Sequence, residues 1–215
     1  MSDLPSYVAS RWDDILISFG EHLELVLIPI IAATLLSIIV ALAVERHAIV
    51  REIVTTTSAL ALTIPSLALF VLLIPLVGLG PTGAYIGLTI YAIYPIFVTA
   101  VTGLSTVDKG VLESARGMGM DPLRRIAVVK LPLAWPVVLA GIRTTTTVIC
   151  AIAVAAAYTQ GGGFGEYLFS GVNRLGGANA LAQIIVGIVG TVLVALLLEA
   201  VYAVVERLTV SKGIR

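Results

Sequence analysis

Long apolar stretches separated by short charged segments make up most of this chain. Because a helix needs about 20 consecutive apolar residues to cross a bilayer, the charge-free intervals count the predicted spans. The first interval, Leu25–Val44, lies between Glu24 and Glu45 and has the length of one crossing. The stretch from Ile53 to Val107 contains no Asp, Glu, Lys or Arg, which predicts two further spans.

Glycine and proline mark the break within that longer stretch. The sequence Gly-Leu-Gly-Pro-Thr-Gly at positions 78–83 favours a turn, so we expect spans near Val54–Val77 and Ala84–Leu104. A fourth span is predicted at Leu131–Tyr158 and a fifth at Leu181–Val205. The chain is therefore predicted to be an all-α, polytopic transmembrane helical bundle of about five spans.

The basic residues predict the orientation of this bundle. Five crossings place the termini on opposite sides of the membrane, and cytoplasmic loops carry the excess of Lys and Arg. Arg11 and Arg174 lie on one side, whereas the loops after spans one, three and five hold the larger group: Arg46, Arg51, Lys109, Arg116, Arg124, Arg125, Lys130, Arg207, Lys212 and Arg215. We expect the N-terminus outside and the C-terminus in the cytoplasm.

The N-terminal residues 1–24 differ in composition from the rest. They are acidic and lack the basic start of a secretory signal, so they are interpreted as an external N-terminal segment. Trp12 and Phe19 suggest an interfacial helix there, and a loosely ordered tail is the alternative. Residues 25–215 are predicted to form one transmembrane domain. Five helices make a thin bundle, so we expect a dimer.

Composition and charge exclude several classes of protein. Hydrophobic residues make up 59% of the chain and charged residues 12%, far from a water-soluble domain. The formal net charge is zero, which gives no electrostatic case for a nucleic-acid partner. Cys150 is the single cysteine and is expected to be a buried apolar residue. We find no spacing typical of a catalytic triad or a metal site.

The segment from Ser105 to Lys130 predicts two short helices. Asp108 can cap the first and Gly119 can end it, while Asp121-Pro122 is a start signal for the second, through Leu123 to Val129. The first helix carries an apolar stripe at helical spacing: Val111, Leu112, Ala115 and Met118. Such a helix either lies on the membrane surface or enters a groove on a cytoplasmic partner.

This loop carries a family motif. Glu113-Ser114-Ala115, then three residues, Gly119, nine residues, Val129, one residue and Leu131-Pro132 resemble the EAA loop of ABC-importer permeases, E-A-A-x3-G-x9-I-x-L-P. Ser114 and Val129 replace alanine and isoleucine and keep size and character. The stretches 112–120, 131–134, 140–143 and 161–169 are similar to the subfamily that imports osmoprotectants such as glycine betaine, choline and carnitine.

The resemblance implies a type I ABC importer permease whose cytoplasmic loop 105–132 contains a coupling helix. In that family the helix docks in a groove of a separate ATPase subunit. Glu113, next to Ser114, would then make polar contact with the ATPase, Ala115 would allow close approach and Gly119 would turn the chain. Leu131 and Pro132 would fix how the loop joins the fourth span.

The resemblance also implies the partners and the location. We expect two copies of a cytoplasmic ABC ATPase, which would hold ATP and Mg, and a second permease, identical or paralogous. An external substrate-binding protein would deliver the solute. The chain itself is expected to hold no cofactor, to catalyse no reaction, and to lie in the bacterial cell (inner) membrane.

A glycine-rich segment follows the fourth span. It lacks the Gly-Lys-Ser/Thr ending of a phosphate-binding loop, so nucleotide binding is not predicted. We interpret it as a flexible external loop that contacts the binding protein, with a plain connector as the alternative. The residues concerned are Gly161, Gly162, Gly163, Phe164, Gly165 and Glu166.

Several residues within the spans are candidates for the transport pathway or its gating. Tyr91 and Tyr94, one turn apart, suit cation–π contact with a quaternary ammonium group, although such tyrosines also serve in packing. Arg143 lies near the membrane midplane with Glu199 as a counter-ion, which favours either an internal ion pair or a pathway role. The remaining candidates are the kink-forming Pro65 and Pro95, whose kinks are either gating or static.

The motif leaves the solute open. An importer of another small solute, such as methionine or an amino-acid derivative, would share the coupling loop. A standalone secondary transporter, a small channel or a non-transporting membrane scaffold are alternatives from other classes.

Overall fold

The computed structural model describes residues 4–45 and 47–210, and within them every regular element is helical. Arg46, Lys212, Arg215 and the first three residues of the N-terminal segment lie outside the described part. The elements in chain order are α1 (Leu4–Ser10), α2 (Trp12–Val44), α3 (Ala48–Ala61), α4 (Ser66–Val77), α5 (Pro81–Ser105), α6 (Lys109–Gly117), α7 (Pro122–Arg125), the π-helix η1 (Ile126–Lys130), α8 (Leu131–Ala153), the 3-10 helix η2 (Val154–Thr159), α9 (Phe164–Asn173) and α10 (Ala180–Thr209).

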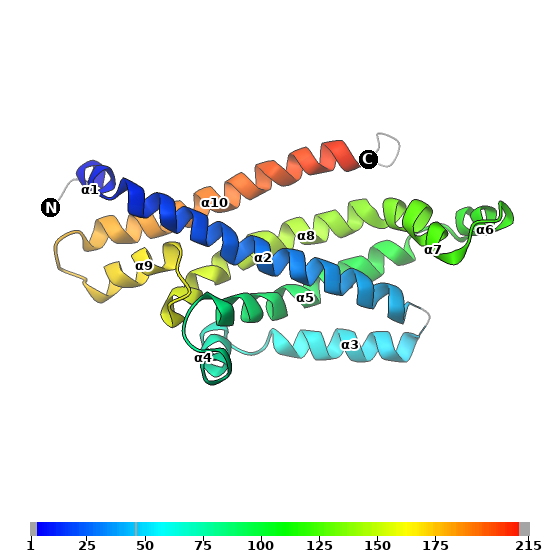
Figure 1. Ribbon diagram of the computed structural model, residues 1–215, viewed down its shortest axis with the longest axis horizontal. Helices are drawn as coiled ribbons and strands as arrows, with labels where there is room; N and C mark the ends of the chain where they lie inside the picture. The colour runs from blue at the N-terminus through cyan, green and yellow to red at the C-terminus, as the bar shows by residue number, and fades with distance from the viewer. Residues whose placement is uncertain (1–3, 46, 211–215) are drawn as a thin grey trace.

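The described helices form one elongated bundle (Figure 1). α2, α5 and α10 run in one direction, and the α3–α4 pair and α8 return in the other (Figure 1). α1 and α9 lie at one end, and α6 and α7 extend beyond the other (Figure 1). Across the described ranges 4–45 and 47–210, four helices are long and apolar enough to cross a membrane, and α3 and α4 together would make a fifth span. The predicted multi-pass all-α fold is confirmed.

The first long helix begins earlier than its predicted span. α2 starts at Trp12 and continues without a break past Leu25 to Val44. Its 33 residues are about 50 Å long at 1.5 Å per residue, which exceeds the roughly 30 Å hydrocarbon core. Most of the predicted N-terminal segment is therefore an extension of the first spanning helix. Whether that extension lies outside the membrane stays a prediction.

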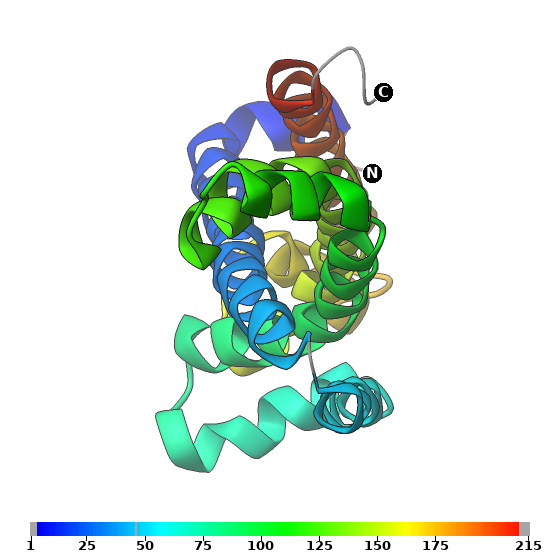
Figure 2. The same ribbon diagram turned by 90° about the vertical axis from the view of Figure 1, so that its right-hand side faces the viewer.

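The second span is not the single helix that the apolar stretch predicts. α3 and α4 are separate helices whose axes differ by 97°, and Figure 2 shows α3 end-on with α4 running across the bundle at the same level, below the other helices. The break falls at Pro65, which lacks an amide donor and disfavours helical geometry in the residue before it. The predicted Pro65 kink is thus a full break between two short helices.

The turn between the second and third spans forms as predicted. Gly78 and Gly80 both have positive φ angles, +80° and +119°, which a residue with a side chain adopts only with strain. Pro81 then occupies the first turn of α5, where its missing N–H costs no hydrogen bond.

The centre of the bundle is formed by α2, α5 and α8, which pack closely together. Small residues at these contacts let the helix backbones approach, as is typical of membrane proteins. Examples with at most 1% of their surface exposed are Ala33 on α2, Ala92 and Ala100 on α5, and Ala134 on α8. Large apolar side chains such as Ile39 on α2 and Leu196 on α10 are instead exposed, as expected for a surface that faces lipid.

Candidate functional site

The loop between α5 and α8 contains the two short helices that its sequence predicts. The Asp108 carboxylate accepts hydrogen bonds from the amides of Gly110, at 2.6 Å, and Val111, at 3.2 Å, so it caps α6. The Asp121 carboxylate likewise accepts from the amides of Leu123 and Arg124, both at 3.0 Å, and caps α7. Both helices therefore begin where capping chemistry predicts.

Gly119 turns the chain between these helices. Its φ angle is +80°, and the amide of Met120 donates back to the carbonyl of Ala115 at 3.2 Å. This bond closes the C-terminal end of α6 in the manner of a Schellman turn. The predicted role of Gly119 as a turn residue is confirmed.

The surface of α6 is mostly uncovered. Glu113 and Ser114 are exposed, and the apolar side chain of Met118 is 72% exposed. Ala115 differs, because it is only 2% exposed and points into the loop. α6 packs against α7 and η1 within the loop. That Ala115 allows close approach to an ATPase stays a prediction.

The loop joins α8 through a π-helical segment. The Leu131 amide donates to the carbonyl of Ile126, five residues back, and Pro132 follows in the first turn of α8. Leu131 is half-buried and Pro132 is exposed. In the same segment Lys130, which is buried, forms an ion pair with Glu45 at the end of α2. The loop is therefore attached both to α8 and to α2.

Three of the predicted pathway residues line one groove. A cavity of about 540 Å³ lies between the end of α3, α5 and α8, and Tyr91, Tyr94 and Pro95 are among its lining residues. The other lining residues are apolar side chains, Gly141 and three threonines: Leu62, Val137, Ala140, Val148, Ile149, Ile152, Thr99, Thr144 and Thr145. The Tyr91 hydroxyl donates to the Ile64 carbonyl, immediately before Pro65, and so fixes the α3–α4 break against α5.

Arg143 and Glu199 do not line this groove. Arg143 forms an ion pair with Glu199, with Nε at 2.7 Å from Oε1, as predicted, and its Nη1 contacts Glu206 Oε2 at 3.1 Å. The three side chains are between 36% and 48% exposed on the surface between α8 and α10. One guanidinium and two carboxylates leave one negative charge uncompensated within this group.

The glycine-rich segment after α8 is packed rather than freely exposed. Gly161, Gly163, Phe164 and Gly165 are buried, Gly162 is half-buried and Glu166 is exposed. The Gly163 amide donates to the Glu21 carboxylate at 2.8 Å, and a Cβ at Gly163 would lie 3.0 Å from the ring of the buried His22. The expected flexible loop is therefore a segment held against α2, since glycine permits this approach. Contact with a binding protein stays a prediction, and of these residues Glu166 is the accessible one.

Two titratable groups at this end of the bundle have raised pKa values. Although Glu166 is accessible at the surface, the surrounding protein partly desolvates its carboxyl, which raises its pKa above its ordinary value, and the nearby charge of Glu21 raises it further. Burial also raises the pKa of the neighbouring Tyr167 phenol to about 12.

Within residues 4–45 and 47–210, no group of three or more His, Cys, Asp or Glu is arranged to hold a metal ion.

Sequence reasoning missed three of these contacts. The Glu45–Lys130 and Glu21–Gly163 pairs join residues 85 and 142 positions apart, for which the sequence carries no signal. Glu206, by contrast, follows Glu199 by seven residues, which places both on one face of a helix. That spacing would have added Glu206 to the Arg143 group.

Comparison with known proteins covers almost the whole chain. Residues 33–210 match the family described as binding-protein-dependent transport system inner membrane component. The chain is similar to the glycine betaine/carnitine/choline transport system permease protein OpuCB of Bacillus subtilis. The two are 33% identical over 215 residues, which cover 100% of this chain and 97% of the relative. The chain is 30% identical over 200 residues, or 91% of each chain, to the osmoprotectant import permease protein OsmW of Salmonella typhimurium.

Among solved structures, the fold is similar to a chain of the MetNI methionine ABC transporter. The TM-score is 0.79 at 20% sequence identity, over 98% of this chain and 100% of the other. At this identity the match concerns the arrangement of the helices.

Proposed function

Since the chain belongs to the family of binding-protein-dependent transport system inner membrane components, we propose that it is the permease subunit of an ATP-driven importer of quaternary ammonium osmoprotectants. Glycine betaine, choline and carnitine are the solutes named for its relatives. The chain is a multi-pass protein of the inner membrane. ATP hydrolysis is assigned to a separate subunit.

The observation that carries the proposal is helix α6. It extends from one end of the bundle, is capped by Asp108 and presents Glu113 and Met118 to the surroundings (Figure 1). A short helix with exposed polar and apolar side chains is suited to dock in a groove of a partner. We assign this partner as two copies of a cytoplasmic ATPase that hold ATP and Mg, with α6 on the cytoplasmic side.

The proposed mechanism is mechanical. Closure of the ATPases would move α6 as a rigid body, and α7 and η1 would pass the movement directly to α8. The Lys130–Glu45 ion pair would pass it to α2 at the same time. These helices belong to the centre of the bundle, so a displacement there would change access to the pathway.

The charged group on α8 and α10 supports a second permease subunit. Charged side chains in membrane segments face a cavity or a partner rather than lipid. Arg143, Glu199 and Glu206 are partly exposed on the single chain, so a second copy or a paralogue would cover them. The groove with Tyr91 and Tyr94 offers aromatic rings for a passing quaternary ammonium group. An external binding protein would deliver the solute at the opposite end.

The test is uptake of labelled glycine betaine at high osmolarity in cells with and without the gene, with choline, carnitine and methionine as competitors. Uptake that depends on the gene and is blocked by quaternary ammonium compounds is expected. Glu113→Ala should abolish it while the protein still inserts, whereas Glu52→Ala, an exposed glutamate on α3, should not.

Two outcomes would contradict the proposal. Competition by methionine alone would reassign the solute to an amino-acid derivative and leave the importer class intact. Uptake that survives ATP depletion and responds to ion gradients would instead indicate a standalone secondary transporter.

A further inference from the structure

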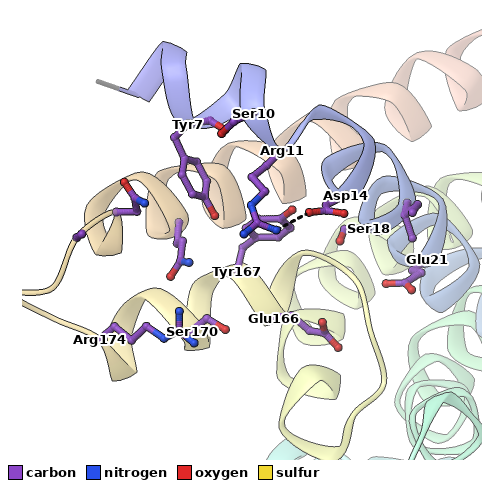
Figure 3. A pocket seen from close by; sticks show the side chains of 14 residues that line it. Tyr7, Ser10, Arg11, Asp14, Ser18, Glu21, Glu166, Tyr167, Ser170 and Arg174 are labelled. Carbon is purple, nitrogen blue, oxygen red and sulfur yellow. Dashed lines mark hydrogen bonds and ion pairs between the residues drawn. The ribbon is translucent and has the colours of Figure 1, made fainter. Parts of the chain in front are cut away.

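A large polar cavity lies at the end of the bundle opposite α6. It has a volume of about 740 Å³ and is enclosed by α1 and the first turns of α2 on one side and by α9 and the start of α10 on the other (Figure 3). Its lining contains both acidic and basic side chains as well as two tyrosines, Tyr7 and Tyr167. None of the predicted coupling or pathway residues belongs to it, whereas Glu166, one of the residues predicted to contact the binding protein, does.

One end of the cavity carries uncompensated negative charge. Glu21 from α2 and Glu166 from α9 both line it, and they are close enough for the charge of Glu21 to raise the pKa of Glu166. In the described part of the chain neither carboxylate forms an ion pair. Two carboxylates facing one space without a cation repel each other, and a bound cation would relieve that repulsion.

One aromatic side chain lies next to this acidic end. Tyr167 follows Glu166 directly on α9, and Figure 3 shows its ring beside the Arg11 side chain, with Tyr7 farther from the two carboxylates. Tyr7 is 8% exposed, so its position is fixed by packing. Carboxylates combined with tyrosine rings are the chemistry that attracts a quaternary ammonium group, which has a diffuse charge and an apolar surface.

The other end of the cavity is basic. Glu166 and Ser170 lie one turn apart on α9, and Arg174 follows four residues later, directly after the helix ends at Asn173. Eight residues at helical rise correspond to about 12 Å. Arg174 extends toward Ser170 (Figure 3) and forms no ion pair within the described residues. The remaining arginine of the cavity, Arg11, is already paired with Asp14 at 2.9 Å. Arg174 is therefore the available partner for a carboxylate.

An unpaired acceptor lies in the same lining. The side-chain carbonyl of Gln183, in the first turn of α10, is buried and has no hydrogen-bond partner among the described residues. A buried acceptor without a donor is unfavourable, so a ligand that supplies a hydroxyl would be stabilised there. This acceptor is independent of the charged groups and points to the same cavity.

We propose that this outer cavity is a receiving site for the solute, in which Glu21, Glu166 and Tyr167 hold the ammonium group and Arg174 holds the carboxylate of zwitterionic solutes. The proposal rests on the proposed function, because it assumes that the cargo is a quaternary ammonium compound. Choline, a cation without a carboxylate, would use only the acidic and aromatic end. Glycine betaine and carnitine would use both ends.

The experiment compares two solutes in the reconstituted transporter with its ATPase and binding protein. Initial uptake rates are measured in separate reactions with the binding protein saturated by choline or by glycine betaine. Arg174→Gln should lower the betaine rate about three- to tenfold relative to the choline rate, since tenfold corresponds to about 1.4 kcal/mol. Glu166→Gln should lower both rates, and Glu166→Asp should restore part of each.

The ratio of the two rates distinguishes a solute site from other roles. A folding defect in Arg174→Gln would lower both rates equally, and Glu52→Gln, outside the cavity, should change neither. If Arg174→Gln weakens binding of the binding protein and leaves the ratio unchanged, the cavity is a protein-docking surface and the inference is overturned. If wild type takes up neither solute, the proposed function itself has failed.

Discussion

The buried ammonium group of Lys130 forms an ion pair with the carboxylate of Glu45, the residue that directly follows α2. Lys130 is also the last residue of the π-helical segment that joins the coupling loop to α8. One ion pair therefore fastens the loop to two central helices. The Lys130 side chain is 8% exposed, whereas that of Glu45 is 37% exposed. The Lys130 charge therefore needs its counter-ion more than the Glu45 charge does.

This asymmetry predicts different effects for the two single substitutions. Glu45→Gln leaves a buried ammonium without a counter-ion, which should destabilise the protein by about 3–5 kcal/mol. Lys130→Met removes the buried charge and leaves a carboxylate that water reaches, so its effect should be much smaller. Thermal unfolding of the purified protein in detergent measures both.

The double variant Glu45→Gln/Lys130→Met serves as the control. It should be more stable than Glu45→Gln alone, because no buried charge remains. Equal melting temperatures for the two single variants would show that the pair is solvated and contributes little.

The caps of the coupling loop give a second prediction. Asp108→Ala removes the acceptor for two amides of α6 and should destabilise that helix by about 1 kcal/mol. Asp108→Asn keeps a capping oxygen and should behave like wild type. Hydrogen exchange of the α6 amides checks this, with faster exchange expected only in the alanine variant. Equal exchange rates in Asp108→Ala and Asp108→Asn would contradict the capping role of Asp108.

The loop was the part of the fold that sequence predicted best, because its structure is set locally. Asp108, Gly119 and Asp121 act on amides and dihedral angles within a few residues, so their effect can be read from spacing alone. The turn at Gly78 and Gly80 follows the same logic. Hydropathy likewise located the long spans α5, α8 and α10.

The contacts that depend on packing could not be predicted in this way. Apolar composition is the same for one straight span and for two helices at 97°, so it could not reveal the break at Pro65. Glycines in an apparent loop suggest flexibility, but Gly163 has a φ angle of +78° and its added Cβ would lie 3.0 Å from Nδ1 of His22, so a side chain there would be strained. Burial of this kind depends on neighbours that are distant in sequence.

Two glycines in long helices give a third, matched prediction. A Cβ at Gly190 on α10 would lie 2.3 Å from the ring of Phe164, which is 1% exposed and has no space to move. Gly190→Ala should therefore destabilise the protein by about 1–3 kcal/mol. Gly20 on α2 has no atom within 4 Å of its added Cβ, so Gly20→Ala should stabilise by about 1 kcal/mol through helix propensity. Melting temperatures that shift in the same direction would contradict the packing of Phe164.

The charged group between α8 and α10 gives a fourth prediction. Arg143→Gln leaves Glu199 and Glu206 without a counter-ion in a membrane helix and should reduce assembly of the transporter. Glu206→Gln should be tolerated, because it leaves the Arg143–Glu199 pair intact and removes the excess charge. Size-exclusion chromatography of the purified complex checks both variants. Normal assembly of Arg143→Gln would mean that the group is exposed to water.

The raised pKa of Glu166 predicts how stability depends on pH. Because burial and the charge of Glu21 raise this pKa above its unfolded value, the folded protein binds the proton more tightly than the unfolded chain. The resulting stabilisation is present below the unfolded pKa and is lost as the pH rises through the folded pKa. Glu166→Gln keeps a neutral side chain at every pH. Its melting temperature in detergent, relative to wild type, should therefore be higher at pH 8 than at pH 4.

A bound cation should change that pH dependence, which connects this last prediction to the outer cavity. Choline held by Glu21 and Glu166 would raise the melting temperature of wild type more at pH 8 than at pH 4, because the raised pKa of Glu166 favours its protonation at low pH and protonation would weaken the site. The same addition should have less effect on Glu166→Gln, and Glu52→Gln should follow wild type. A pH-independent effect of choline would mean that the ammonium group binds elsewhere, even if the pH dependence of Glu166→Gln without choline is as predicted.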